Sequence, residues 1–258
     1  MLTKQSIPIE ASLKQNNMPS IKDDRGYNQG FKPCDALNIR TERRCKYIMS
    51  KMNLAQKARI LEIGCGTGKL SYLLAKNTGW DILGIDRCQA FIEEARQNFN
   101  LKNLHYDIID INQIETLRKQ NTFDYIVGDG ILHHLYYNMD SALKDFNPLL
   151  KENGKIIFLE PNILNPYCYL IFNFALFRKL ANLEPGEMAF TKRFIAEKLK
   201  RFGFSDIQIE YKDFLLPNTP SHIISPVIII GSLLENIPII NKLSQSMCIS
   251  AVKDKTIL

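Results

Sequence analysis

Three glycines at alternate positions follow directly after a short apolar run, and they have the clearest chemical meaning in the chain. Residues 60–70 read ILEIGCGTGKL, which places Gly64, Gly66 and Gly68 between an expected strand and an expected helix. Glycine tolerates positive φ angles and lets backbone N–H groups approach a ligand closely. The start of a helix also attracts polar and anionic groups. The segment therefore predicts a loop that holds a small ligand.

Two common phosphate-binding motifs do not fit this loop. A dinucleotide fingerprint counted from Gly64 needs a further glycine at the position of Lys69. A P-loop needs glycine where Ile63 stands and Ser or Thr where Leu70 stands. The remaining pattern is Glu-x-Gly-x-Gly-x-Gly, which begins at Glu62.

An acidic residue closes the next expected strand, in the sequence Gly84-Ile85-Asp86. A carboxylate at the end of the second strand of such a sheet can accept hydrogen bonds from both hydroxyls of a ribose. The structural alternative for Asp86 is the N-cap of a helix expected over residues 87–99, and the two roles are compatible. We predict the ribose contact, which makes the expected ligand an adenosine derivative.

With these motifs the sequence resembles the class I S-adenosylmethionine-dependent methyltransferases. The resemblance implies a methyltransferase that uses S-adenosylmethionine and releases S-adenosylhomocysteine. It also places an acidic side chain near the adenine; Asp110 is the first choice and Asp107 the reserve, because the register of the third strand is open. The residues assigned to the cofactor in this way are Glu62, Gly64, Cys65, Gly66, Gly68, Asp86, Arg87, Asp110, Ile111 and Gly128.

Further segments match the family in order along the chain. Residues 123–135 resemble the segment after the fourth strand, where backbone near Gly128 lines the methionine part of the cofactor. Gly154 and residues 156–161 resemble the turn and strand that follow. The resemblance covers about residues 45–160 by motif and the last two strands by pattern only.

Two adjacent histidines, His133 and His134, follow the fourth expected strand and are the catalytic candidates, His134 ahead of His133. Methyl transfer needs a nucleophile placed in line with the methyl group, and it needs a base only when the acceptor arrives protonated. Imidazole titrates near neutral pH and suits that role. The structural alternative is that the histidines satisfy a local helix start. Asp129 and Glu160 also lie at strand ends, where each could be a base or a polar cap.

The residues that follow the fourth strand restrict the class of molecule that can accept the methyl group. Methyltransferases of exocyclic base nitrogens usually carry an Asp/Asn/Ser-Pro-Pro-aromatic motif there, whereas this chain reads Asp-Gly-Ile-Leu at residues 129–132. Nucleic acid is therefore a disfavoured acceptor. The pattern resembles the branch of the family that methylates small molecules such as quinones, lipids and secondary metabolites.

Two apolar insertions, at about residues 161–190 and 215–246, support a lipophilic acceptor. Residues 167–177 are rich in aromatic side chains, and residues 226–234 are almost wholly apolar. The plain interpretation is that both segments pack on the sheet and on each other. The sharper hypothesis is an apolar acceptor pocket presented to a membrane surface, with nearby basic residues meeting lipid head groups.

The elements that must position these residues alternate along the chain. Apolar runs at 59–63, 82–85, 104–109, 125–127, 155–159, 207–214 and 248–252 predict strands, and the periodicity between them predicts helices such as 70–76 and 90–98. A helix is also expected over residues 35–54, and another from an N-cap at Thr191 to a stop at Gly203. We expect an α/β fold: a Rossmann-like, doubly wound sheet of seven mostly parallel strands with an antiparallel last strand.

Composition agrees with a folded α/β chain and excludes several other classes. Hydrophobic residues make up 45% and charged residues 23% of 258 residues, which rules out disordered, collagen-like and coiled-coil chains. Six scattered cysteines without a metal-binding spacing favour a reducing compartment, so a cytoplasmic location is expected. The first residues lack the apolar core of a secretory signal, and the longest apolar run is too broken to span a bilayer.

The chain is expected to divide into a flexible N-terminal arm, residues 1–30, and a methyltransferase domain, residues 31–258. Residues 1–60 carry the excess of positive charge, which is either a solvated flank or a contact with nucleic acid, anionic lipid or an acidic substrate. Tyr27 and Phe31 are candidates to close over the acceptor.

Three other functions compete with catalysis on a small acceptor. A nicotinamide-dependent oxidoreductase is disfavoured by Lys69. The chain could instead bind S-adenosylmethionine without turnover, with structural histidines, or it could methylate a protein.

Overall fold

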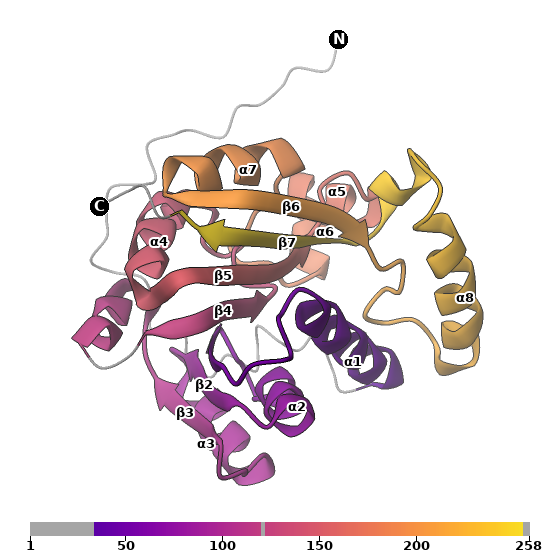
Figure 1. The fold of residues 1–258 in the computed structure, drawn as a ribbon. Helices are drawn as coiled ribbons and strands as arrows, with labels where there is room; N and C mark the ends of the chain where they lie inside the picture. The colour runs from indigo at the N-terminus through magenta and orange to yellow at the C-terminus, as the bar shows by residue number, and fades with distance from the viewer. Residues whose placement is uncertain (1–33, 120–121, 255–258) are drawn as a thin grey trace.

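Seven strands form one sheet in the order β3-β2-β1-β4-β5-β7-β6 (Figure 1), in a computed structural model that describes residues 34–119 and 122–254. The strands are β1 (Arg59–Ile63), β2 (Asp81–Asp86), β3 (Leu104–Ile108), β4 (Phe123–Asp129), β5 (Leu150–Pro161), β6 (Phe204–Lys212) and β7 (Ser246–Lys253). The first five strands pair in parallel, and β7 runs antiparallel to both of its neighbours. The expected fold class is confirmed. The expected arm, with Tyr27 and Phe31, lies outside the described residues.

Helices connect the strands and cover both faces of the sheet (Figure 1). The α-helices are α1 (Asp35–Ser50), α2 (Lys69–Thr78), α3 (Gln89–Asn98), α4 (Met139–Phe146), α5 (Pro166–Asn173), α6 (Ala175–Leu180), α7 (Lys192–Arg201) and α8 (Ile224–Leu234). Short 3₁₀ segments are η3 (Ile111–Lys119), η4 (Tyr136–Asn138), η5 (Asn147–Leu149), η6 (Ser221–Ile223) and η7 (Ile240–Leu243).

The sheet separates two hydrophobic clusters because successive residues of a strand face opposite sides. Ile60 of β1 packs with the helices α1, α2 and α3, whereas Leu61 packs with η3, α4 and α7. Ile156 and Ile157 of β5 divide in the same way. This double layer buries the parallel strands on both faces and explains their continuous apolar sequence.

The expected helix that begins after Thr191 is α7, and its boundaries follow from two residues. The Thr191 side chain accepts a hydrogen bond from the backbone N–H of Phe194, and Gly203 has a φ of 79° just after the helix ends. Ile195 and Leu199 are buried on one side of α7. The N-cap and the stop predicted from the sequence are therefore confirmed.

Strand β5 is longer than expected because polar residues precede its apolar part. The apolar run predicts residues 155–159, whereas β5 starts at Leu150, which pairs with Phe123 before a register shift. β4 is also longer than the apolar run at residues 125–127. It extends to Asp129 because Gly128 and Asp129 pair with Phe158 and Leu159 of β5. Pairing to a neighbouring strand, rather than local pattern, sets these ends.

Both apolar insertions leave the sheet at the same end, where the parallel strands have their carboxyl termini. The first follows β5 and contains α5 and α6, and the second follows β6 and contains α8 and η7. The Asn162 amide donates to Lys242 O and Ser244 O at 2.8 Å, and Asn165 donates to Leu243 O at 2.6 Å. These bonds fasten the two insertions to each other beside the end of the sheet.

Among residues 34–119 and 122–254, no helix has the length and apolar character needed to cross a bilayer. The six cysteines are all described and carry free thiols.

Candidate active site

The glycine loop is a tight turn that joins β1 to α2. Gly64, Gly66 and Gly68 have φ angles of 69°, 52° and 83°, which side chains other than glycine adopt only with strain. The N–H groups of Gly64 and Cys65 both donate to Ile85 O, at 2.8 and 3.0 Å. The loop is thus tied to the end of β2, and the glycines are required by the path of the backbone.

The three glycines differ in the space around them. A Cβ on Gly68 would lie 2.5 Å from Tyr106 Oη, and one on Gly64 would lie 2.7 Å from Ile131 Cδ1. A Cβ on Gly66 would meet no atom within 4 Å. Gly64 and Gly68 are therefore packing positions, whereas the loop is open at Gly66. That open backbone next to a carboxylate fits an adenosine ligand.

Asp86 is the carboxylate beside Gly66. Its Oδ2 accepts from Gly66 N and its Oδ1 accepts from Cys88 N, each at 2.9 Å. Because Cys88 is the N-cap residue of α3, Asp86 also supports the start of that helix. A carboxylate has about four acceptor positions and can accept from several donors at once, which is compatible with a ribose contact. The ribose contact stays a prediction.

The residues predicted for the adenine end lie near Asp86 but differ in position. Asp86 is paired with Ile108, so Asp110 lies beyond the end of β3, whereas Asp107 lies within the strand and is exposed. Asp110 Oδ1 accepts from the N–H and the side-chain amide of Asn112, both at 2.8 Å. Ile111 packs on the α4 side of the sheet. The placement favours Asp110 over Asp107, and its cofactor contact stays a prediction.

Glu62 lies beneath the glycine loop. Its carboxyl is 2% exposed and accepts a hydrogen bond from the hydroxyl of Ser71 in α2. Burial raises the pKa of Glu62 to about 8, and the bond from Ser71 opposes this shift only in part. Cys65 is also buried, which raises its thiol pKa well above the usual value. Both residues support the loop from inside, and a direct cofactor contact of either stays a prediction.

The segment after β4 packs directly on the glycine loop. Ile131 is the connecting side chain, since a Cβ on either Gly64 or Gly128 would lie 2.7 Å from one of its carbon atoms. A Cβ on Gly128 would also meet the ring of Phe158 at 2.8 Å. Because Gly128 has no side chain, the segment after β4 can pack close to the glycine loop.

Glu160 organises the same segment from the end of β5. The carboxylate is fully buried and accepts from the N–H groups of Ile131, Leu132 and His133 at 3.0, 2.7 and 3.2 Å. Its Oε2 also lies 2.9 Å from His133 Nδ1. Of the two alternatives for Glu160, the geometry favours the polar cap. Asp129 is likewise engaged, in an ion pair with Arg44 of α1.

The two histidines meet a glutamate from the first insertion. His133 Nε2 lies 4.0 Å from Glu187 Oε2, and His134 Nδ1 lies 3.4 Å from Glu187 Oε1. Glu187 is 1% exposed, and the neighbouring Met188 N donates to His133 O at 3.0 Å. Sequence reasoning missed Glu187; an acidic residue in an otherwise apolar insertion was the available signal.

The first insertion also contacts the turn between β2 and α3, beside the predicted cofactor residues. Arg87 Nη2 lies 3.7 Å from Glu184 Oε1, and both side chains are partly exposed. Residues 184–188 therefore extend from the β2–α3 turn to the histidines. This segment joins the predicted cofactor residues and the predicted catalytic residues into one site.

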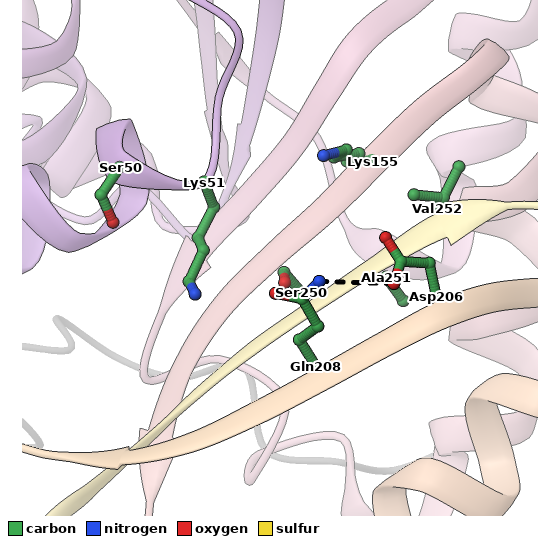
Figure 2. A pocket seen from close by; sticks show the side chains of 8 residues that line it. All are labelled: Ser50, Lys51, Lys155, Asp206, Gln208, Ser250, Ala251 and Val252. Atoms are coloured by element: carbon green, nitrogen blue, oxygen red, sulfur yellow. Dashed lines mark hydrogen bonds between the residues drawn. The ribbon is translucent and has the colours of Figure 1, made fainter.

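A separate polar hollow of about 200 Å³ lies at the opposite end of the sheet (Figure 2). Its lining residues are Ser50, Lys51, Lys155, Asp206, Gln208, Ser250, Ala251 and Val252. Gln208 Nε2 donates to Asp206 Oδ1 at 3.3 Å across it (Figure 2). Lys155 pairs with Tyr125 near the start of β4, so the hollow is remote from the glycine loop.

Comparison with known proteins gives one family and several relatives. A family model described as a methyltransferase domain matches residues 54–190. Ubiquinone biosynthesis O-methyltransferase of Histophilus somni is 34% identical over 136 residues, 51% of this chain and 55% of that protein. Demethylmenaquinone methyltransferase of Staphylococcus aureus is 29% identical over 122 residues, 45% of this chain and 48% of that protein. The chain thus spans about half the length of these curated relatives.

Solved structures share the fold. An S-adenosylmethionine-dependent methyltransferase from Archaeoglobus fulgidus superposes with a TM-score of 0.61 at 20% identity, covering 90% of this chain and all of that one. Human N-acetylserotonin methyltransferase, solved with S-adenosylmethionine, has a TM-score of 0.59 at 15% identity, covering 90% of this chain and 58% of that one. At these identities the likeness shows the fold alone.

We expect Gly66→Ala and Gly68→Ala to separate ligand binding from folding. Each variant places alanine at positive φ, at a cost of about 1–2 kcal/mol, but only the Cβ at position 68 collides with Tyr106 and Ala95. Thermal unfolding should show the larger loss for Gly68→Ala, and calorimetry should show weaker S-adenosylhomocysteine binding in a folded Gly66→Ala protein. Normal binding by Gly66→Ala would contradict the placement of the ligand.

Glu62→Gln should flatten the pH dependence of stability. Because the folded-state pKa of about 8 exceeds the ordinary value of 4.5, the folded protein keeps a proton that the unfolded chain loses between these values. Stability from this group is therefore complete at low pH and declines as pH rises, by up to about 1.4 kcal/mol per unit. Urea unfolding between about pH 5 and pH 8 measures the slope. Glu93→Gln, at an exposed position of α3, is the control; equal slopes for wild type and Glu62→Gln would refute the assignment.

Proposed function

The chain belongs to the family of S-adenosylmethionine-dependent methyltransferases, and from this premise we propose that it methylates a hydroxyl oxygen of a small lipophilic molecule. The acceptor class is a lipid, a quinone or a secondary metabolite. The observation that carries the proposal is the cluster of His133, His134 and Glu187 beside the glycine loop. Two relatives, an O-methyltransferase of ubiquinone biosynthesis and a demethylmenaquinone methyltransferase, support the acceptor class by their names.

The donor end of the proposed site consists of the glycine loop and Asp86. When bound, S-adenosylmethionine supplies a methyl group on a positively charged sulfur, which a nucleophile displaces in line. The open backbone at Gly66 gives room for the ligand, and the Asp86 carboxylate beside it is of the type that accepts hydrogen bonds from ribose hydroxyls. In this proposal Asp110, which follows the end of β3, contacts the adenine, and its position after the strand that pairs with β2 supports this.

The acceptor end consists of the histidine–glutamate cluster. A hydroxyl is a poor nucleophile until it loses its proton, so this reaction needs a group that promotes that loss. His134 Nδ1 lies 3.4 Å from Glu187 Oε1, and the Glu187 side chain is buried. His133 is held in a fixed orientation by Glu160.

The first insertion closes the site from one side. Its residues 184–188 contact Arg87 at the donor end and the backbone of His133 at the acceptor end. Arg178 supports this segment, since its guanidinium donates to Glu184 O at 2.6 Å and to Glu187 O at 3.0 Å. Arg178 is therefore occupied inside the insertion and is not placed to bind a lipid head group.

An apolar surface on the two insertions supports both a lipophilic acceptor and a peripheral membrane contact. All exposed large hydrophobic side chains of the described residues, except Leu54, Ile108 and Tyr137, lie in these insertions. They are Leu164, Tyr167, Tyr169, Leu170, Phe174, Leu176, Phe177, Leu180, Ile223, Ile229, Ile230, Leu233, Ile237, Ile239, Ile240 and Leu243. Lys179 and Lys242 are exposed within the same segments. Such a surface suits a contact with anionic lipid.

Methyl transfer from S-adenosylmethionine to hydroxylated quinone precursors or to a lipid extract tests the proposed function. Asp86→Ala should weaken S-adenosylhomocysteine binding by about 1–3 kcal/mol, the cost of polar partners left unmade. His134→Ala should lower kcat by about 10²–10⁴-fold while donor binding persists. Asp81→Ala, at the exposed opposite end of β2, is the control. Donor binding without any methylated product would favour a binding protein or a protein acceptor instead.

Co-sedimentation with vesicles tests the membrane contact. The wild-type protein should sediment with vesicles rich in phosphatidylglycerol, and less so at high salt. Leu176 and Leu233 are 66% and 64% exposed, and replacing both with Asp should weaken vesicle binding at least about tenfold, because each leucine contributes about 1.5–3 kcal/mol when buried. Leu54→Asp, outside the insertions, should bind as wild type. Equal loss in both proteins, or no sedimentation at all, would reject the contact.

A further inference from the structure

Three side chains of the types that bind transition metals converge beside the glycine loop. They are His133 and His134, which follow β4, and Glu187 from the first insertion. One ligand atom from each lies within 4.8 Å of the others. Two imidazoles and one carboxylate are a common ligand set for zinc and for non-haem iron in enzymes.

The separations are close to those of a tetrahedral site. Zn²⁺ binds nitrogen and oxygen at about 2.0–2.2 Å, which places neighbouring ligand atoms about 3.3–3.5 Å apart. His134 Nδ1 and Glu187 Oε1 are 3.4 Å apart, and His133 Nε2 and Glu187 Oε2 are 4.0 Å apart. The two distances end on different oxygens of Glu187, so binding of one ion would draw the three side chains closer together.

Glu187 carries an unsatisfied oxygen that faces the histidines. The side chain is 1% exposed, and Oε1 accepts from Glu184 N at 3.0 Å. Glu187 Oε2 has no hydrogen-bond partner among the described residues. A buried carboxylate oxygen without a partner is costly, and each such atom in a native structure needs a reason. A cation between Glu187 and the histidines would supply one.

His133 is oriented as metal-binding histidines are. Its Nδ1 lies 2.9 Å from Glu160 Oε2, where it donates to a carboxylate that also accepts three backbone N–H groups. A neutral imidazole that donates through Nδ1 has its lone pair on Nε2, which is the atom that faces Glu187. Carboxylate–histidine–metal arrangements of this kind fix the ring and its tautomer.

We propose that His133, His134 and Glu187 bind one divalent transition-metal ion, Zn²⁺ by ligand type. Only the role of the ion rests on the proposed function. Three protein ligands leave a fourth position, which the hydroxyl of the acceptor can take. The O–H bond then breaks with its electron pair on the oxygen and its proton leaving to water, while both imidazoles remain ligands. In the metal-loaded protein, the two histidines therefore do not take the proton themselves.

Titration of chelator-treated protein with Zn²⁺, followed by calorimetry, tests the site without any acceptor. We expect one ion per chain. Glu187→Gln should weaken binding more than about 100-fold, since even a change outside the ligand set costs about 10–100-fold. His134→Ala should do the same. Both variants keep all six cysteines, so ions bound by thiols would be unaffected.

Two variants serve as controls, and the spectrum of bound Co²⁺ is a second readout of the site. His105→Ala removes an exposed histidine of β3, and Glu184→Gln alters the neighbouring glutamate, which lies outside the cluster. Both should bind Zn²⁺ as wild type. Co²⁺ in place of Zn²⁺ should give the visible absorption of a tetrahedral ion in wild type and lose it in Glu187→Gln. Circular dichroism establishes that each variant is folded, and His134→Ala serves if Glu187→Gln is not.

The proposal fails if wild type binds no ion, or if binding is unchanged in Glu187→Gln and His134→Ala. S-adenosylhomocysteine binding is measured on the same samples. Donor binding without metal binding rejects this inference alone, whereas metal binding without donor binding rejects the proposed function and leaves the ion site standing.

Discussion

A single buried carboxylate, Glu160, holds together the region where the donor and acceptor ends of the site meet. Burying this charge is tolerable only because three consecutive backbone N–H groups and one imidazole surround it. Those four donors define the conformation of residues 131–133. Ile131 is thereby pressed on Gly64, and His133 is turned toward Glu187. The rest of the site follows from this one interaction.

The insertions complete what the sheet begins. A parallel sheet with helices on both faces brings the glycine loop and Asp86 together from neighbouring strands. Residues 184–188 then connect Arg87 to the histidines and supply Glu187. Arg44 of α1 bonds to Asp129 at the end of β4 and to Gln245 and Ser246 at the end of the second insertion. Helix α1, β4 and the second insertion therefore meet at Arg44.

Glu62 and Glu160 are the same residue type in different surroundings. Both are buried glutamates at the carboxyl ends of strands. Glu62 has one hydroxyl partner, and burial raises its pKa to about 8. Glu160 instead lies against three backbone N–H groups and one imidazole. The number of N–H groups that reach each carboxylate, rather than its place in the sequence, separates the two.

The amino-acid sequence by itself determined the elements and the donor loop of this protein. The apolar runs predicted all seven strands, and the glycine spacing predicted the loop between β1 and α2, which bonds to Asp86 at the end of β2. Such features depend on residues near one another in the chain, whose preferences are local. Tertiary structure alone decided that Glu160 caps the segment after β4 and that Glu187 faces the histidines. These contacts join segments far apart in the chain, and only the packed fold brings such segments together.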